Sequence, residues 1–422
     1  MMDLRFGRID LRHGRLLFFM VVLLVFLALL GIFVEGFDAA WEGFLLLQRT
    51  PARLISDFMK VASIGGTLLN GALVGALGLG LVLWNRVKLS GPTFAAIFTM
   101  AGFAFFGKTV TNILPIMGGV YLAAKFARKG FSSYLIIALF GTALAPLVSF
   151  FAWEMGDSFV SSWILAILLG MTAGFLLPPV AVAMLHIHQG YNLYNVGLTC
   201  GFVGLFAASF IRAGKQVFLP RMEWLDTNPP VLLLLVPLIS LFLILGALFL
   251  EGKSCWKNFW KIQKIPGRLP SDFMDMASIG GALCNAGVLG LGGSLYLYAT
   301  GSAFNGPTLG GLFTVMGFGA FGTHPRNSIP VVLGVFLACL IFKVPHSAPG
   351  AVLAAIFVTT AGPLAGEFGF PVGVLAGFTH FAMVMQTGGW HGGLNLYNNG
   401  FAGGLTVGLF VAIIEWYRSV RE

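Results

Sequence analysis

Long apolar runs alternate with short polar or charged segments along almost the whole chain. In the first half, runs of 17 to 28 residues lie at positions 16–34, 68–84, 134–153, 160–187 and 195–211. Comparable runs in the second half lie at positions 231–250, 281–298, 348–365, 371–387 and 394–416. A helix of about 20 apolar residues spans the hydrocarbon core of a bilayer. The pattern therefore predicts an all-α, polytopic integral membrane protein.

Some apolar segments are shorter, or carry more charge, than a lipid-facing helix allows. Residues 91–107 and 110–126 would each form a helix of about 25 Å, against roughly 30 Å of hydrocarbon. Their counterparts in the second half are residues 306–322 and 329–342. Each pair can form a full hairpin or a re-entrant pair. Residues 44–66 are charged enough to predict an interfacial or re-entrant piece, and Pro178 and Pro179 predict a break in the fourth run.

The chain contains an internal duplication. Residues 56–115 reappear without a gap as residues 271–330, shifted by 215 positions. Both copies begin with Ser-Asp-Phe-Met, contain Ala-Ser-Ile-Gly-Gly and end with Asn-x-x-Pro. A second motif, His-x-Gly-x-Asn-Leu-Tyr-Asn-x-Gly, begins at His188 and again at His391. We therefore expect two membrane repeats. Their predicted bounds are residues 1–226 and 227–422.

The number of crossings decides how the two repeats are oriented. Five to seven helices in each half, with the short segments adding an even number of crossings, give an odd total, so the second copy begins on the opposite side of the membrane. The densest basic cluster, residues 253–268, then falls on the same side as the basic residues at both chain ends. Because cytoplasmic loops carry the excess of Lys and Arg, we expect both termini in the cytoplasm of a bacterium, with the protein in the inner membrane. Inverted repeats of this kind are typical of transporters and channels.

Composition excludes a soluble globular protein. Hydrophobic residues make up 57% of the chain and charged residues only 10%, whereas about a quarter of the residues are charged in soluble domains. The net charge is +9, and the basic residues flank apolar runs, which favours membrane anchoring over nucleic-acid binding. The four cysteines lack metal-binding spacing, and no motif predicts a metal, a cofactor or an enzyme.

Polar residues that recur in both halves are the candidates for a solute path. An amide side chain offers a donor and an acceptor to a polar solute, and one helical turn would place the histidine and first asparagine of the second motif on one face. The alternative is that these amides form interhelical hydrogen bonds. The candidate path residues are Asn70, Asn285, Asn112, Asn327, Asn192, Asn195, Asn395, Asn398, His188, His391, Tyr194 and Tyr397.

Charged residues and prolines in the same motifs suggest coupling and gating. Each recurring aspartate follows an arginine by four residues, so it can form a helix-end ion pair or cap, or it can carry a coupling proton or sodium ion. The basic residues near the short hairpins can extend to the interface, act as gates or attract anions. The possible coupling residues are Asp57 and Asp272, and the possible gating residues are Lys108, Arg326, Pro115 and Pro330.

The run at residues 61–75 resembles the urea transporter family, which has an Asn-Gly-x-Leu-Val-Gly type motif followed by a proline-containing span and a Leu-Pro box. Here Asn-Gly-Ala-Leu-Val-Gly begins at Asn70, and Pro92 and Leu114-Pro115 follow in that order. The resemblance implies an inverted-repeat, trimeric, channel-like protein that passes a flat neutral solute between aromatic side chains. The second half departs from it, with Ile329 before Pro330, and each half carries the additional His/Asn/Tyr motif.

We therefore expect a transporter or channel for a small polar solute that is neutral or weakly charged, with a urea- or amide-like molecule as the first candidate. One alternative is an H⁺- or Na⁺-coupled transporter of a small metabolite, and another is an intramembrane enzyme or a structural or sensory protein. The expected partners are the solute and membrane lipid, with a homo-oligomer left open.

Overall fold

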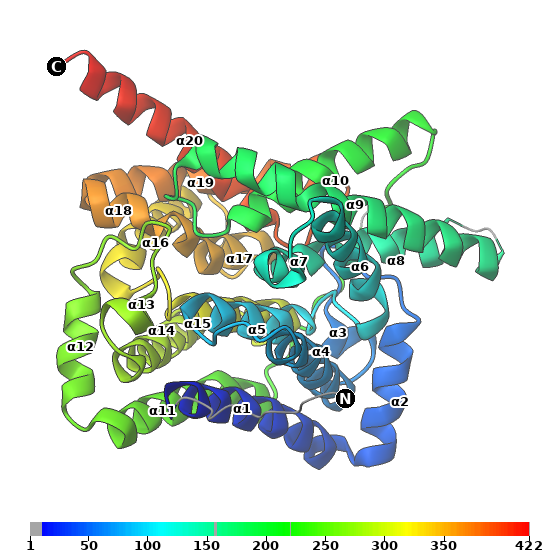
Figure 1. Cartoon of the computed structure of the whole chain (residues 1–422), viewed down its shortest axis with the longest axis horizontal. Coiled ribbons are helices and arrows are strands. Elements are labelled where there is room, and N and C mark those ends of the chain that lie inside the picture. Colours follow the sequence, from blue (N-terminus) through cyan, green and yellow to red (C-terminus); the bar gives the residue numbers. More distant parts are fainter. Residues whose placement is uncertain (1–10, 156–157, 220, 422) are drawn as a thin grey trace.

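The computed structural model describes residues 11–155, 158–219 and 221–421, and it is built of helices (Figure 1). Within these residues the only extended pairing is a single bridge between Ser56 and Glu223. Ten helical segments of the described chain are long and apolar enough to cross a membrane. The predicted all-α polytopic membrane fold is confirmed. The first ten residues, whose arginines contributed to the predicted orientation, lie outside the described residues.

The first repeat contains α1 to α10. Its longer helices are α1 (Leu11–Glu35), α4 (Ile64–Trp84), α6 (Val110–Phe126), α9 (Phe159–His188) and α10 (Asn195–Ala213). Its shorter elements are α2 (Phe37–Gln48), α3 (Phe58–Val61), α5 (Gly91–Phe103), η1 (Phe131–Ser133), α7 (Leu135–Gly141), η2 (Thr142–Leu144) and α8 (Ala145–Trp153). The predicted break at Pro178 and Pro179 is wrong, because α9 runs through both prolines as one helix. Membrane helices tolerate proline where neighbouring groups satisfy the freed carbonyls.

The second repeat follows the same order. Its longer helices are α11 (Pro230–Glu251), α14 (Ile279–Ala299), α16 (Pro325–Ile341), α19 (Phe370–Trp390) and α20 (Asn398–Ser419). Its shorter elements are α12 (Ser254–Ile262), α13 (Phe273–Met276), α15 (Gly306–Phe318), α17 (Pro349–Phe357), η3 (Val358–Ala361) and α18 (Gly362–Phe368). In both repeats the apolar segment that begins with the seventh helix, α7 or α17, is therefore interrupted by a 3-10 turn, η2 in the first repeat and η3 in the second.

The short helices α5 and α15 cross antiparallel at the centre of the molecule. A Cβ atom on Gly102 would lie 2.7 Å from the carbonyl oxygen of Gly310, so only glycine permits this approach of the two backbones. Near the crossing, the ring of Phe98 meets that of its repeat counterpart Phe313 at a centroid distance of 5.9 Å. Nearly every residue of both helices is buried, which explains how helices too short to span lipid are tolerated.

The C-terminal helices of the two repeats meet at the same place. A Cβ atom on Gly197 of α10 would lie 3.0 Å from the Cα of Gly400 in α20, and the rings of Tyr194 and Tyr397 are 4.8 Å apart. Both pairs join equivalent positions of the second motif. Contact between equivalent residues is what a twofold axis produces, so the repeats are related by a pseudo-twofold axis through these pairs.

Helices α2 and α12 stand across the direction of the other helices at opposite edges of the molecule, right and left in Figure 1. α12 buries Cys255, Phe259 and Ile262 but exposes Trp256 and Trp260, a pattern that suits the membrane interface. Their opposite placement follows from the inverted orientation of the repeats. The start of α1 and the end of α20 both lie toward the α12 edge (Figure 1).

The two recurring aspartates join the repeats. Asp57 accepts a hydrogen bond of 3.2 Å from the N–H of Gly306, the first residue of α15 in the other repeat. Asp272 accepts one of 3.1 Å from the N–H of Gly91, the first residue of α5. A carboxylate is favourable at a helix N-terminus because it satisfies an unpaired N–H and opposes the helix dipole. Each aspartate also caps the one-turn helix that follows it within its own repeat.

We call these two interactions the crossed caps, because each repeat caps a helix of the other. They predict that both aspartates contribute to the stability of the protein. We expect Asp57→Ala and Asp272→Ala each to lower the free energy of unfolding by about 1.5–3 kcal/mol, the typical net worth of hydrogen bonds to a charged group. Unfolding of the detergent-purified protein by heat or denaturant measures this change. Asp226→Ala, at an exposed position, is the matched control and should leave stability unchanged. Wild-type stability in both variants would contradict the role of the caps.

Candidate functional site

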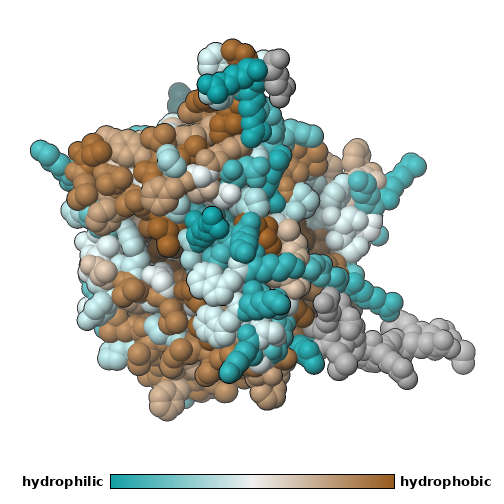
Figure 2. All heavy atoms as spheres, turned by 90° about the vertical axis from the view of Figure 1, so that its left-hand side faces the viewer, coloured by the Kyte–Doolittle hydropathy of each residue, from teal (hydrophilic) through white to brown (hydrophobic). Residues whose placement is uncertain are grey.

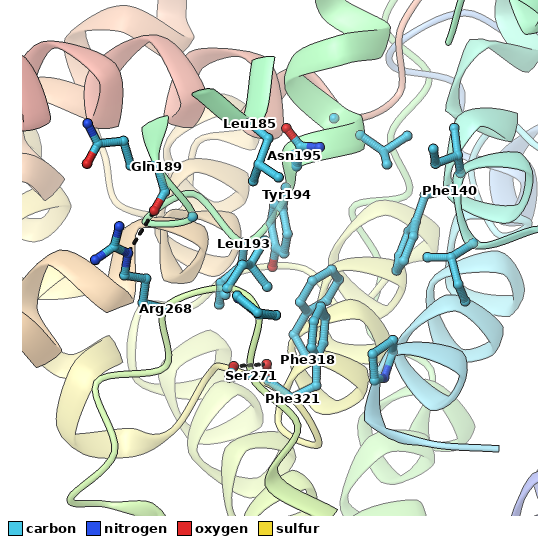
Figure 3. A pocket seen from close by; sticks show the side chains of 18 of the residues that line it. Phe140, Leu185, Gln189, Leu193, Tyr194, Asn195, Arg268, Ser271, Phe318 and Phe321 are labelled. Atoms are coloured by element: carbon cyan, nitrogen blue, oxygen red, sulfur yellow. Dashed lines mark hydrogen bonds between the residues drawn. The ribbon is translucent and has the colours of Figure 1, made fainter. Parts of the chain in front are cut away.

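A cavity of about 770 Å³ opens between the two repeats on the side of α12 (Figure 3). Its mouth is formed by Gln189 from the loop after α9 and by Arg268 from the loop after α12. Arg268 donates a hydrogen bond of 2.7 Å to the backbone carbonyl of Gln189, and its guanidinium stacks on the Tyr191 ring at 4.3 Å. Ser271 lies deeper in the wall and donates to the carbonyl of Phe321 at 2.7 Å. The mouth is therefore polar and carries charges of both signs, because the side-chain amide of Gln189 donates to the carboxylate of Glu415.

The inner end of the cavity is an aromatic layer on the pseudo-twofold axis. Tyr194 packs against Phe318 at 4.5 Å between ring centroids and against Tyr397 at 4.8 Å. Phe140 and Phe321 complete the layer, with centroids 5.5 and 5.0 Å from that of Phe318. Figure 3 shows Tyr194, Phe318, Phe321 and Phe140 gathered around this end. The layer closes the cavity at the centre of the protein.

The face that carries the cavity mouth is rich in basic side chains. Hydrophilic side chains gather across the middle of this face in Figure 2. The exposed basic residues in the loops and helix ends that follow α4, α6, α11 and α20 are Arg86, Lys88, Lys125, Arg128, Lys129, Lys253, Lys257, Lys261, Lys264, Arg268, Arg418 and Arg421. A solute entering from this side meets a positive potential.

The equivalent position in the first repeat is closed. Arg53, the counterpart of Arg268, is only 4% exposed and forms an ion pair of 2.9 Å with Glu154. Its guanidinium also donates to the carbonyls of Gly392 and Leu219, at 3.3 and 2.7 Å. Equivalent arginines thus lie at an open mouth in the second repeat and at a closed position in the first.

The segment that connects the repeats, residues 214–229, provides the seal, and we call it the linker; Pro220 within it is outside the described residues. The N–H of Glu223 donates to the carbonyl of Ile55 at 3.1 Å, and the N–H of Ile55 donates to the carbonyl of Arg221 at 3.4 Å. The N–H of Asp57 donates to the carbonyl of Glu223 at 3.1 Å. The N–H of Leu225 donates to the Asp57 carboxylate at 2.9 Å. The linker therefore lies as an extended strand along residues 54–57 and covers that half-site.

The first pair of predicted path asparagines is occupied by the protein itself. The amide of Asn70 donates to the carbonyls of Ala104 and Lys108, both at 2.8 Å, and its oxygen accepts from Gln48. Asn285 makes the same bonds in the second repeat, with Gly319, Thr323 and Gln263 as its partners. These asparagines hold the turn that follows the short helix, and neither lines the cavity.

The second pair also caps helices. The oxygen of Asn112 accepts from the N–H of Thr109, and its amide donates to the Gly107 carbonyl and the Ser149 hydroxyl. Asn327 is placed in the same way at the start of α16. The alternative of interhelical and capping hydrogen bonds accounts for all four of these amides, since each of their polar atoms has a protein partner.

The histidine motifs do not form the helical turn that we expected. α9 ends at His188, where Gln189 adopts a left-handed backbone conformation, so Asn192 lies in a loop and not one turn further along a helix. His188 instead donates from Nε2 to the Asn195 oxygen at 2.8 Å, while its Nδ1 accepts backbone N–H groups. In the second copy α19 ends at Trp390, and Nε2 of His391 lies 3.0 Å from the Asn398 oxygen.

The loops that follow the histidines dock on the other repeat. The N–H of Leu193 donates to the carbonyl of Thr360 in η3, and the N–H of Leu396 donates to the carbonyl of Ala143 in η2, both at 3.0 Å. The Asn192 oxygen accepts from the Thr360 hydroxyl at 2.5 Å. Asn395 bonds within its own loop, to the N–H of Tyr397, and reaches the Gly197 carbonyl across the axis. Of the twelve predicted path residues, Tyr194, Asn195 and Tyr397 line the cavity.

The possible gating residues differ from one another. Lys108 does not extend to the interface as one interpretation held, because its side chain is fully buried beside Phe103. Arg326 is exposed at the start of α16 and lines a separate polar cavity of about 300 Å³ together with Pro330. Pro115 is buried inside α6. Of the two structural roles predicted for the aspartates, the helix cap is confirmed and the ion pair with the neighbouring arginine is wrong, because backbone N–H groups engage each carboxylate.

Three residues of the cavity were missed in the sequence. The polar residues Gln189, Ser271 and Arg268 line it. In the sequence, Arg268 stands out only as a neighbour of an aspartate and Ser271 only as the start of a repeated motif. Recurrence in both halves could have indicated Ser271, whose counterpart is Ser56. Gln48 recurs in the same way, as Gln263 at the same offset. Nothing in the sequence signals Gln189, whose counterpart is Gly392.

A family model described as a protein of unknown function (DUF1576) matches the chain in two segments, residues 38–213 and 251–416. The segments cover most of the chain and follow helices α2 to α10 and α12 to α20. The chain belongs to the DUF1576 family. Comparison with curated proteins and with solved structures found no match. The resemblance of this DUF1576 protein to urea transporters gains no support from these comparisons.

The cavity and its closed counterpart predict unequal access to two equivalent serines. In a variant lacking the four buried native cysteines, Ser271→Cys should react with a water-soluble thiol reagent applied to the α12 side. Ser56→Cys, which is fully buried beneath the linker, should react much more slowly from either side. Labelling rates measured in oriented vesicles test this difference. Equal rates at the two positions would contradict the asymmetry.

Proposed function

We propose that this DUF1576 protein is a transporter that carries a small polar solute across a bacterial inner membrane. The observation that supports the proposal is the contrast between two equivalent half-sites. The half-site bounded by Arg268 and Ser271 is an open cavity, whereas the one bounded by Arg53 and Ser56 is covered by the linker. The half-site of the second repeat is therefore open, and the half-site of the first repeat is closed.

Two copies of one unit in opposite orientations can exchange these conformations. If the first repeat opens while the second closes, the site at the aromatic layer becomes accessible from the other side, as in inverted-repeat transporters. The moving part on the closed side is the linker, which holds residues 54–57 by only a few backbone hydrogen bonds. Solute binding at the layer then shifts the balance between the two states.

The basic residues around the open mouth give the orientation. Cytoplasmic loops carry the excess of Lys and Arg, so the cavity would face the cytoplasm, together with the start of α1 and the end of α20. The linker would then seal the periplasmic side.

The cavity suits a small solute with hydrogen-bonding groups. Polar groups lie at Arg268, Gln189 and Ser271, and the aromatic layer offers flat faces with the Tyr194 hydroxyl 3.3 Å from Thr359. A urea- or amide-like molecule is the first candidate to test. Coupling through Asp57 or Asp272 is disfavoured, because both carboxylates hold helix N-termini and lie outside the cavity lining.

Transport by exchange of conformations predicts that access to the two serines depends on solute. A transported solute should change the labelling rates of Ser271→Cys and Ser56→Cys in opposite directions, because opening one half-site closes the other. The rates are measured in proteoliposomes with and without solute on each side. Native cysteines are removed in all variants, and an exposed position such as Lys343→Cys serves as the control whose rate stays constant. A solute flux with no change at either serine would indicate a channel.

Filling the cavity should stop flux without unfolding the protein. Ser271→Trp places a large side chain in the open half-site, and we expect at least a tenfold loss of solute uptake into proteoliposomes. Ser294→Trp, at a buried position of α14 away from the cavity lining, controls for overpacking alone. Unchanged uptake in Ser271→Trp would remove this cavity from the path.

A further inference from the structure

Lys108 is a buried lysine whose side-chain nitrogen has no hydrogen-bond or ion-pair partner in the described part of the chain. Its side chain is 0% exposed, and its ammonium nitrogen makes no hydrogen bond or ion pair. The ammonium lies 5.0 Å from the centroid of the Phe103 ring, which provides a cation–π contact but no counter-ion. Burial of an unpaired charge costs several kcal/mol, so proteins seldom retain one without a use for it.

Other unsatisfied polar groups surround this lysine. The Tyr397 hydroxyl has no hydrogen-bond partner, and the Thr99 hydroxyl lies beside it without reaching hydrogen-bond geometry. Phe103 links the two groups, because its ring is 4.7 Å from that of Tyr397 and faces the ammonium of Lys108. The Cys200 thiol is close enough to interact electrostatically with Lys108. The Phe103 ring thus contacts both Lys108 and Tyr397, two residues whose polar ends are buried without a hydrogen-bond partner.

This region adjoins the proposed path on its closed side. Tyr397 lines the inner end of the open cavity, and the Phe103 ring contacts both Tyr397 and Lys108. Phe103 is the repeat counterpart of Phe318, which already lines the open cavity. When the first repeat opens, Phe103 would take the place in its wall that Phe318 has now. Lys108 stands directly behind that wall.

The second repeat has no cation at this position. The counterpart of Lys108 is Thr323, whose hydroxyl is also buried without a partner. The duplicated position therefore has a threonine hydroxyl on the open side and a lysine on the closed side. A solute that is bound by both halves in turn meets a single full charge along the inner path.

We propose that the transported solute is a small monovalent anion and that Lys108 provides its counter-charge, assisted by the hydroxyls of Tyr397 and Thr99. This assignment rests on the proposed transport function and specifies its substrate class. A single ammonium balances one negative charge, and two neutral hydroxyls can donate to the remaining lone pairs of a carboxylate or similar group.

Paired anions and neutral amides of the same shape test the charge of the solute. The purified full-length protein is titrated with formate and formamide, acetate and acetamide, and lactate and lactamide, and binding is followed by the shift in Tm. We expect at least one anion to bind about tenfold or more tightly than its amide, as the loss of a charge-assisted hydrogen bond predicts.

Variants of Lys108 assign that preference to the ammonium. Lys108→Met should raise the Kd of the anion about tenfold or more, whereas Lys108→Arg should keep most of the affinity. Without ligand, Lys108→Met should be at least as stable as the wild type, because it removes an unpaired buried charge. A lysine with a merely structural role would give a less stable variant. Lys343→Gln, at an exposed lysine, is the matched control.

The outcomes separate the two proposals. Tight binding of an amide or of urea, unchanged in Lys108→Met, would overturn the anion assignment but leave transport intact. The anion assignment would also be overturned, with transport intact, if the wild type bound none of the anions while another solute still changed the labelling rates of Ser271→Cys and Ser56→Cys in opposite directions. Should Lys108→Met fail to fold, Tyr397→Phe and Lys108→Arg carry the test, and an anion affinity unchanged in both would count against the site.

Discussion

The ends of short helices inside a membrane protein leave backbone N–H and C=O groups that water cannot reach, and this constraint governs the whole arrangement. Each repeat solves it with groups from the other repeat. Asp57 and Asp272 bind the first N–H groups of α15 and α5, and the loops after His188 and His391 bind carbonyls of η3 and η2. Interrupted helices can therefore lie at the centre of the molecule. The cavity exists because those interruptions meet there.

Much of this architecture could be predicted from the order of apolar and polar residues. The repeat offset and the odd number of crossings predict inverted halves before any contact is known. The partners of the repeated polar residues could not be predicted in the same way. Asp57 bonds to a residue 249 positions away, and local spacing instead suggested an ion pair with Arg53. Likewise, helical spacing suggested that His188 faces Asn192, but the left-handed conformation of Gln189 ends the helix between them.

The candidate site was harder to predict than the fold for a physical reason. A motif that occurs twice draws attention to what the halves share, and shared polar residues serve mainly to hold the halves together. The properties that distinguish the two half-sites lie at positions where the copies differ. Lys108 of the first repeat corresponds to Thr323 of the second, and Gln189 corresponds to Gly392. The linker has no internal copy at all, yet it decides which half-site is closed.

The crossed caps have a consequence for the origin of the chain. A protein with one copy of the unit could satisfy the start of its short helix only by pairing with a second molecule inserted upside down. Such a pair requires equal amounts of both orientations, which a strong bias of basic residues would prevent. Joining two copies in one chain removes that requirement, because each half then keeps a fixed orientation. The linker that seals one half-site is thus also the segment that joins the two copies. Once joined, the copies could differ in sequence, with a lysine in one half-site and a threonine in the other.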